Sequence, residues 1–156
     1  MGVLFRFSSL SKKIYNDDST RDISAWSLSP SISCQPTDRN NLSLSLNVAK
    51  ENSDIDIYAN TVQGVNVSYQ HVIPKYRVRA GVSAGYSDIE YDGIQNAYTE
   101  ARHDKSKSIS ASVNYAFKSI RNTDVNFSVS YQDNDSNLAI NRYVRTQSTV
   151  SVTKRF

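Results

Sequence analysis

The chain has 156 residues, a formal net charge of +3 and a hydrophobic fraction of 38%, below the roughly 45–50% typical of soluble globular domains. The mean hydropathy is −0.51, and no apolar run approaches the roughly 20 residues that a membrane-spanning helix needs. The basic residues are scattered, so the charge does not support nucleic-acid binding. A single cysteine, Cys34, excludes an internal disulfide and any multi-cysteine metal site.

Apolar and small polar residues alternate with a period of two in repeated segments, which predicts antiparallel β-strands with one apolar and one polar face. Leu42–Val48 is the clearest of these segments. We expect about eight strands, near Val3–Leu10, Ile23–Gln35, Leu42–Lys50, Ile55–Ile73, Tyr76–Asp88, Lys107–Phe117, Asp124–Gln132 and Arg142–Phe156. Several reach the 9–11 residues that a tilted strand needs to cross a bilayer, whereas strands of soluble proteins are commonly about 5–6 residues long.

The predicted connections alternate between short turns and longer polar loops. We expect short turns at Pro36–Asn40, Pro74-Lys75 and Lys118–Asn122, and loops at Ser11–Asp22, Glu51–Asp54, Ile89–Ser106 and Asp133–Asn141. All of the short turns fall on the same side as the C-terminus. Outer-membrane barrels have short periplasmic turns and longer outside loops, so the sequence predicts the C-terminal region of an all-β, antiparallel transmembrane β-barrel.

The two faces predict a lipid side and a lumen side. Aromatic residues such as Trp26, Tyr86 and Tyr131 stand at the ends of the apolar stretches, as in the aromatic girdles of membrane barrels; the alternative is that they form the core of a soluble sandwich. The lumen side is rich in serine, which cannot fill a small barrel, so we expect a larger barrel. The candidate lumen-lining residues are Arg77, Arg79, Asn114, Asn126, Arg145 and Arg155.

The lumen arginines suggest a weak preference for anionic solutes, as in other charged pore linings. The favoured alternative is that they pair with loop carboxylates or with acidic residues on further strands. No catalytic or metal-binding constellation is predicted. Asp133–Asn137 begins like a calcium loop, but Leu138 and Val144 stand where Gly and Glu are required. Neither His71 nor His103 has a second histidine at ligand spacing. The sequence also contains no nucleophile elbow and no glycine-rich phosphate loop, so we expect no enzyme and no cofactor.

The final strand places Val150, Val152 and the terminal Phe156 on one face. This resembles the C-terminal signal by which the barrel-assembly machinery recognises outer-membrane barrels. The last third to half of the chain also resembles the C-terminal barrel of surface lipoprotein assembly modifiers and related outer-membrane β-barrel proteins. The resembling residues are Tyr91-Asp92-Gly93, Arg102-His103-Asp104-Lys105, Tyr131, Asp133, Asp135-Ser136-Asn137, Arg142-Tyr143 and Lys154-Arg155-Phe156. The resemblance implies a role in moving lipoproteins to the cell surface, with such a lipoprotein as a client.

The sequence therefore predicts a protein of the Gram-negative outer membrane that serves transport or surface export. Its expected partners are outer-membrane lipid and the barrel-assembly machinery, and no nucleic acid. The alternatives are a passive porin-like or structural barrel, and a soluble β-sandwich adhesin. Met1-Gly2 leads directly into Val3-Leu4-Phe5 without the pattern of a secretory signal. Either a signal peptide has been removed or the chain is the end of a longer one, and we expect the second, the C-terminal part of a longer protein.

Overall fold

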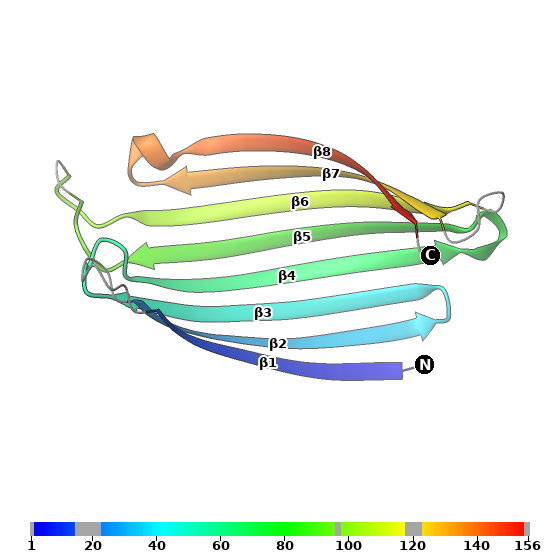
Figure 1. Ribbon diagram of the computed structural model, residues 1–156, viewed down its shortest axis with the longest axis horizontal. Coiled ribbons are helices and arrows are strands. Elements are labelled where there is room, and N and C mark those ends of the chain that lie inside the picture. The colour runs from blue at the N-terminus through cyan, green and yellow to red at the C-terminus, as the bar shows by residue number, and fades with distance from the viewer. Residues whose placement is uncertain (1, 15–22, 96–97, 118–122, 155–156) are drawn as a thin grey trace.

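A computed structural model describes residues 2–14, 23–95, 98–117 and 123–154, and this part of the chain is an all-β antiparallel sheet. The eight strands follow one another as neighbours in chain order, so the sheet is a meander (Figure 1). Their bounds are β1 Gly2–Ile14, β2 Ile23–Thr37, β3 Asn40–Ser53, β4 Asn60–Ile73, β5 Val78–Tyr91, β6 His103–Ala116, β7 Thr123–Ser136 and β8 Tyr143–Lys154. The predicted fold class, all-β with about eight antiparallel strands, is confirmed.

In the part of the chain that the structure describes, the sheet forms a single curved layer with no second layer packed on it (Figure 1). Within the described residues β1 pairs only with β2 and β8 only with β7, so the sheet is open at both edges. The only helices described are two short 3-10 turns, η1 (Pro74–Tyr76) and η2 (Ala139–Asn141). No helix in this part of the chain has the length and apolar character to cross a membrane.

Most strands extend further than the alternation predicted. β5 continues to Tyr91 and β6 begins at His103, so the loop predicted over Ile89–Ser106 is shorter. β7 likewise continues through Asp133 to Ser136, because Lys105 and Lys107 of β6 pair in register with Asp135 and Asp133. Alternating apolar residues therefore mark only part of each strand, and backbone pairing continues beyond them between charged residues.

One predicted strand begins too early. We expected it over Ile55–Ile73, but β4 starts at Asn60 and residues 54–59 form a loop. This loop packs against the residues that follow β5, since the backbone N–H of Asp92 donates to the carbonyl of Ala59 at 3.0 Å. Ala59 and Gly93 are both buried. A Cβ on Gly93 would lie 2.4 Å from the backbone nitrogen of Ile57, so only glycine fits this contact.

The connections separate the sheet into two ends. At the short-turn end, only Asp38 and Arg39 join β2 to β3, and η1 with Arg77 joins β4 to β5. The connections of β3 to β4, β5 to β6 and β7 to β8 are at the loop end, where residues 54–59, 92–95, 98–102 and 137–142 lie. Figure 1 places the C-terminal end of β8 at the short-turn end. The predicted turn over Lys118–Asn122 and part of the loop predicted over Ser11–Asp22 lie outside the described residues.

The described residues contain almost no hydrophobic core. Ala59 and Leu138 are the only apolar residues that are buried among them, and both lie in loops rather than in the sheet. The strands, by contrast, expose many large apolar side chains. The fold is therefore held together mainly by backbone hydrogen bonds between long strands.

Candidate functional site

The two faces of the sheet differ sharply in chemistry. The polar face is the one shared by Ser43, Ser45 and Asn47 of β3, and the apolar face is the one shared by Leu42, Leu44, Leu46 and Val48. On β3 the smaller polar residues are less exposed than the larger apolar ones. Side chains crowd on the concave side of a curved sheet, so the polar face is the concave one.

Directly opposed residues on successive strands form rows across the polar face, and one of these rows consists almost entirely of serine. Its members are Ser33, Ser43, Ser68, Ser83, Ser110, Ser130 and Gln147. The hydroxyls of Ser43 and Ser68 lie 2.6 Å apart, and those of Ser83 and Ser110 lie 2.8 Å apart. The polar face is thus lined with short side chains that bond to one another. β1 departs from this pattern, because Leu4 and Leu10 lie on the polar face.

Small polar residues leave open space above the polar face. One hollow of about 590 Å³ lies over Arg6, Ser31, Ser43 and their neighbours on β1 to β3. Two others, of about 250 and 220 Å³, lie over the serines and glycines of the central strands. The polar face can therefore hold water or small polar solutes.

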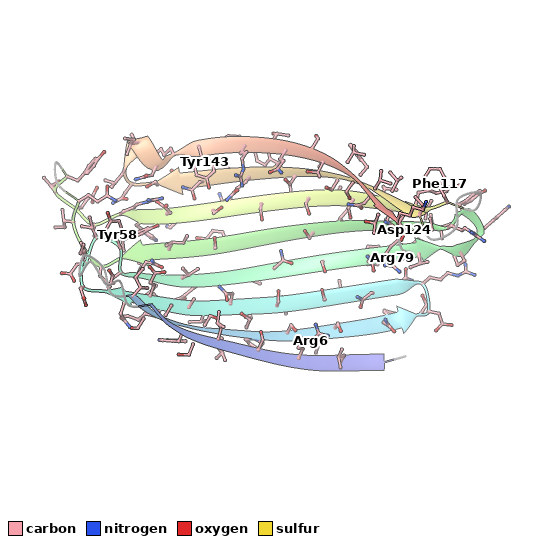
Figure 2. The ribbon with its side chains drawn as sticks, viewed as in Figure 1. Arg6, Tyr58, Arg79, Phe117, Asp124 and Tyr143 are labelled. Carbon is pink, nitrogen blue, oxygen red and sulfur yellow. The ribbon has the colours of Figure 1, made fainter. Side chains whose placement is uncertain are left out.

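Three of the predicted lumen-lining residues fall in a single row. Arg79 of β5 is opposite Asn114 of β6, which is opposite Asn126 of β7. Figure 2 places Arg79 toward the short-turn end of the sheet. Arg145 of β8 lies on the same face, and its Nη2 donates to Oε1 of Gln132 at 2.8 Å.

The other two predicted lumen residues are placed differently. Arg77 is not in a strand, because it follows η1 in the left-handed conformation at φ 55°, and β5 begins only at Val78. This conformation is uncommon for residues other than glycine. The Arg77 carbonyl accepts a hydrogen bond from the backbone N–H of Ala116 at 3.1 Å, which joins the turn to β6. Arg155 lies outside the described residues.

The apolar face exposes large apolar side chains on most of its strands. Leu46 is 48% exposed, Val82 54% and Ile109 58%. Aromatic residues stand at both ends of the apolar stretches, with Trp26, Tyr86 and Tyr131 toward the loop end and Tyr115 toward the short-turn end. The rings of Tyr115 and Phe117 meet edge to face, with their centroids 4.8 Å apart.

The residues of the predicted assembly signal are described only in part. Val150 and Val152 lie on the apolar face, opposite Phe127 and Val125 of β7, and both are exposed. Phe156 lies outside the described residues. The single cysteine, Cys34, is half-buried and lies opposite Leu42, which places it on the apolar face.

The loop end holds the best-buried polar residues of the described chain. Asp104 is 2% exposed and receives hydrogen bonds from the guanidinium of Arg102, whose Nε lies 2.9 Å from Oδ2. Arg102 also stacks over the ring of Tyr91, with its Cζ 4.7 Å from the centroid. The side chain of Asn137 accepts a hydrogen bond from the N–H of His103 and donates one to the carbonyl of Ala101. These bonds tie the 92–102 loop to the 137–142 loop.

The charge state of this cluster is fixed by its contacts. Burial alone would raise the pKa of Asp104, but hydrogen bonds from Arg102 and Ser136 outweigh burial and hold this pKa below its ordinary value. The hydrogen bond to Asp104 correspondingly raises the pKa of Arg102. Both residues therefore remain charged, and together they fasten the base of the 92–102 loop to β6.

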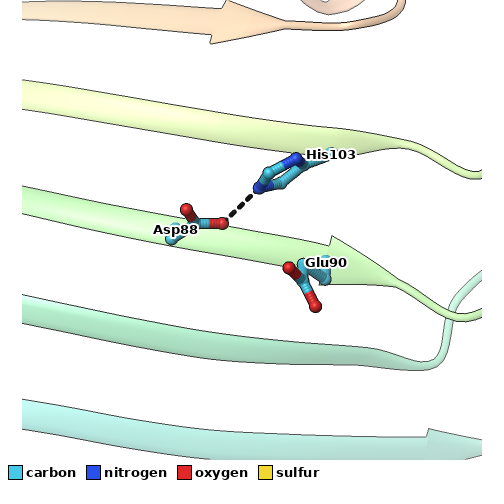
Figure 3. Close-up of side chains that lie close together, drawn as sticks. All are labelled: Asp88, Glu90 and His103. Atoms are coloured by element: carbon cyan, nitrogen blue, oxygen red, sulfur yellow. Dashed lines mark hydrogen bonds and ion pairs between the residues drawn. The ribbon is translucent and has the colours of Figure 1, made fainter.

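A second cluster at the loop end was missed because the predicted strands ended too early. We placed His103 in a loop, but it is the first residue of β6 and lies opposite Glu90 of β5. Its Nε2 lies 2.5 Å from Oδ1 of Asp88, and ligand atoms of Asp88, Glu90 and His103 all lie within 4.8 Å of one another (Figure 3). In the sequence, the alternation of Asp88 and Glu90 indicated two carboxylates on one face of a strand. Only the register between β5 and β6 shows that His103 lies beside them.

No family model and no curated protein of known function matches this chain.

Proposed function

We propose that this chain is the wall of an outer-membrane β-barrel and that its polar face lines a route for transport or export across that membrane. The observation that carries the proposal is the exposed apolar face of a sheet that has almost no core. Soluble proteins rarely expose contiguous apolar patches larger than a few hundred Å². A strand that alternates between lipid and lumen has no need of a core, because lipid covers its apolar face.

The length of the strands supports the same proposal. They contain 12 to 15 residues each, which exceeds the roughly 9–11 that a tilted strand needs to cross a bilayer. On β5 the apolar face runs from Val78 to Tyr86. At a rise of about 3.3 Å per residue, this stretch is about 26 Å long.

The apolar band also crosses the strands at an angle. We define its upper edge by following the apolar face of each strand toward the loop end. The edge is the last large apolar residue before the first polar or charged residue on that face. On β2 to β7 these residues are Trp26, Val48, Val65, Tyr86, Ile109 and Tyr131. Trp26 lies opposite Lys50, two residues beyond Val48, and comparable offsets recur between β3 and β4 and between β5 and β6. In total the edge moves toward the short turns by about six residues over the five steps from β2 to β7.

This drift is what strand tilt produces when the apolar band is level with a membrane. With about 3.3 Å per residue along a strand and about 4.8 Å between strands, the drift corresponds to a tilt of about 40°. Strands of outer-membrane barrels are tilted by about 35–45°. The lower edge moves in the same direction, because Tyr115 of β6 lies four residues beyond Ala111, which is in the same row as Leu42 of β3.

The chemistry of the polar face supports a barrel with a water-filled passage more than a barrel whose interior is filled by side chains. Serine, glycine and asparagine predominate there and leave hollows above the sheet. We propose that further strands complete the ring, since β1 and β8 each leave one edge unpaired in the described chain. The resemblance to surface lipoprotein assembly modifiers supports export of a lipoprotein, and the short polar lining supports passive passage of small solutes as the second candidate.

Thiol labelling of the folded protein in lipid vesicles tests the proposal. In a Cys34→Ser background, single cysteines are placed at residues 42 to 45, which alternate between the two faces. A charged, water-soluble maleimide should label positions 43 and 45 and spare 42 and 44, whereas a lipid-soluble maleimide should label 42 and 44. The unsubstituted chain, whose only cysteine is Cys34 opposite Leu42, serves as a separate control for the lipid side. Equal labelling at all four positions, or a chain that remains soluble without detergent, would refute the proposal.

A further inference from the structure

We infer that Asp88, Glu90 and His103 form a binding site for a divalent transition-metal ion of the Zn²⁺ type. Asp88 and Glu90 are two residues apart on β5 and share the apolar-face side of that strand, and His103 lies opposite Glu90 on β6. One oxygen from each carboxylate and one imidazole nitrogen lie within 4.8 Å of one another. In Figure 3 Asp88 and His103 point toward each other from two neighbouring strands, and Glu90 lies near Asp88 on β5. Small changes in side-chain torsion would bring three ligand atoms onto one ion.

The present contacts leave the cluster short of positive charge. The imidazole bonds to Asp88 at 2.5 Å, but among the described residues Glu90 has no hydrogen bond or ion pair with another side chain. Lys105 is opposite Asp88 in register, yet the structure describes no ion pair between these two residues. A cation between the carboxylates would remove their mutual repulsion.

The site has space and additional oxygen donors. A hollow of about 360 Å³ on the same face of β4 and β5 is lined by Thr61, Gln63, Asp88 and Glu90, among others. Tyr86 also lines this hollow and is the last residue of the apolar face of β5 before Asp88. Waters, or the Thr61 hydroxyl and Gln63 amide, can therefore complete the coordination of an ion that three side chains hold.

The ligand set favours a particular class of metal. One imidazole nitrogen with two carboxylate oxygens suits Zn²⁺ and neighbouring first-row ions, whereas Ca²⁺ and Mg²⁺ prefer all-oxygen sites. An ion here would link β5 to β6 at the base of the 92–102 loop. The three residues lie beyond Tyr86, the upper edge of the apolar band on β5. Metal binding therefore requires that β5 pairs with β6, and it does not require that the polar face lines a passage.

Zinc titration of the full chain, folded in detergent, tests the inference by calorimetry at mildly alkaline pH, where imidazole is neutral. We expect one saturable site that an equal concentration of Mg²⁺ does not compete for. His103→Ala, Asp88→Asn and Glu90→Gln should each weaken zinc binding about tenfold or more. The matched control is His71→Ala, which removes the only other histidine, bonded to Asn40 near the short-turn end.

Glu90→Gln decides the case if the other variants fold poorly, because Glu90 is exposed and its replacement breaks no described contact. Zinc binding that is unchanged in Glu90→Gln would reduce the cluster to an Asp88–His103 ion pair and overturn the inference. Absence of saturable binding, or an equal loss in His71→Ala and His103→Ala, would also overturn it. None of these results bears on the thiol-labelling pattern, so the two proposals fail separately.

Discussion

Arginine at Leu44 should cost far more stability than arginine at Ile109, although the two residues lie in the same row of the apolar face. The row runs from Leu44 through Val67 and Ala84 to Ile109, so three strand steps separate its ends. At about 4.8 Å per step and a tilt of about 40°, the proposed membrane arrangement puts Ile109 about 9 Å nearer the loop-end surface than Leu44. The register thus predicts different depths for residues at equivalent sheet positions.

The expected magnitudes follow from depth. Leu44 is central in the apolar run of β3, so Leu44→Arg should cost about 2–4 kcal/mol, whereas Ile109→Arg at the band edge should cost about 0–1 kcal/mol. Val113 is central in the apolar run of β6, and Val113→Arg should therefore resemble Leu44→Arg. Ser45→Arg, on the polar face, should cost less than about 1 kcal/mol because its side chain reaches water.

The assay is urea unfolding of the four variants in phospholipid vesicles, followed by the fluorescence of Trp26, which is the only tryptophan. Trp26 lies on the apolar face and is 45% exposed, so its emission should report whether that strand is in lipid. Equal costs for Leu44→Arg and Ile109→Arg would refute the tilt argument. A cost for Ser45→Arg as large as that for Leu44→Arg would refute the assignment of the two faces.

Three further predictions concern the loop end and the polar face. Gly93→Ala should destabilise the loop end by about 1–3 kcal/mol, because the added Cβ overlaps backbone atoms. Faster proteolytic cleavage of the connection between β5 and β6 would report this loss. The control is Gly81→Ala, where an added Cβ meets only ordinary van der Waals contacts. Asp104 should stabilise the loop fully above its unfolded pKa of about 3.9 and lose this effect as pH falls through its lowered folded pKa. Hydrogen exchange measured against pH should show that loss, and Asp104→Asn should abolish the pH dependence at a cost of about 2 kcal/mol. Arg145→Gln should reduce any preference for anions in planar-bilayer conductance, and an unchanged preference would remove Arg145 from the pore lining.

The positions of the strands were predictable because alternation is a local property. Leu42–Val48 defines two faces by itself, and the structure confirms that division. The strand ends were less predictable, since alternation stops at the edge of the apolar band while backbone pairing continues. His103 and Asp133 were assigned to loops for this reason, and both are in strands. Residues 54–59 show the opposite error, because their contact with Gly93 cannot be read from neighbouring residues.

The sequence alone determined that this chain forms long antiparallel strands, with an apolar and a polar face and with short turns at one end. A strand needs only its own side-chain order to acquire these properties. The tertiary structure decided which residues stand opposite one another, because register depends on the geometry of turns and loops. The diagonal course of the apolar band, the contacts of Asn137 with Ala101 and His103, and the meeting of Asp88 and Glu90 with His103 all follow from that register.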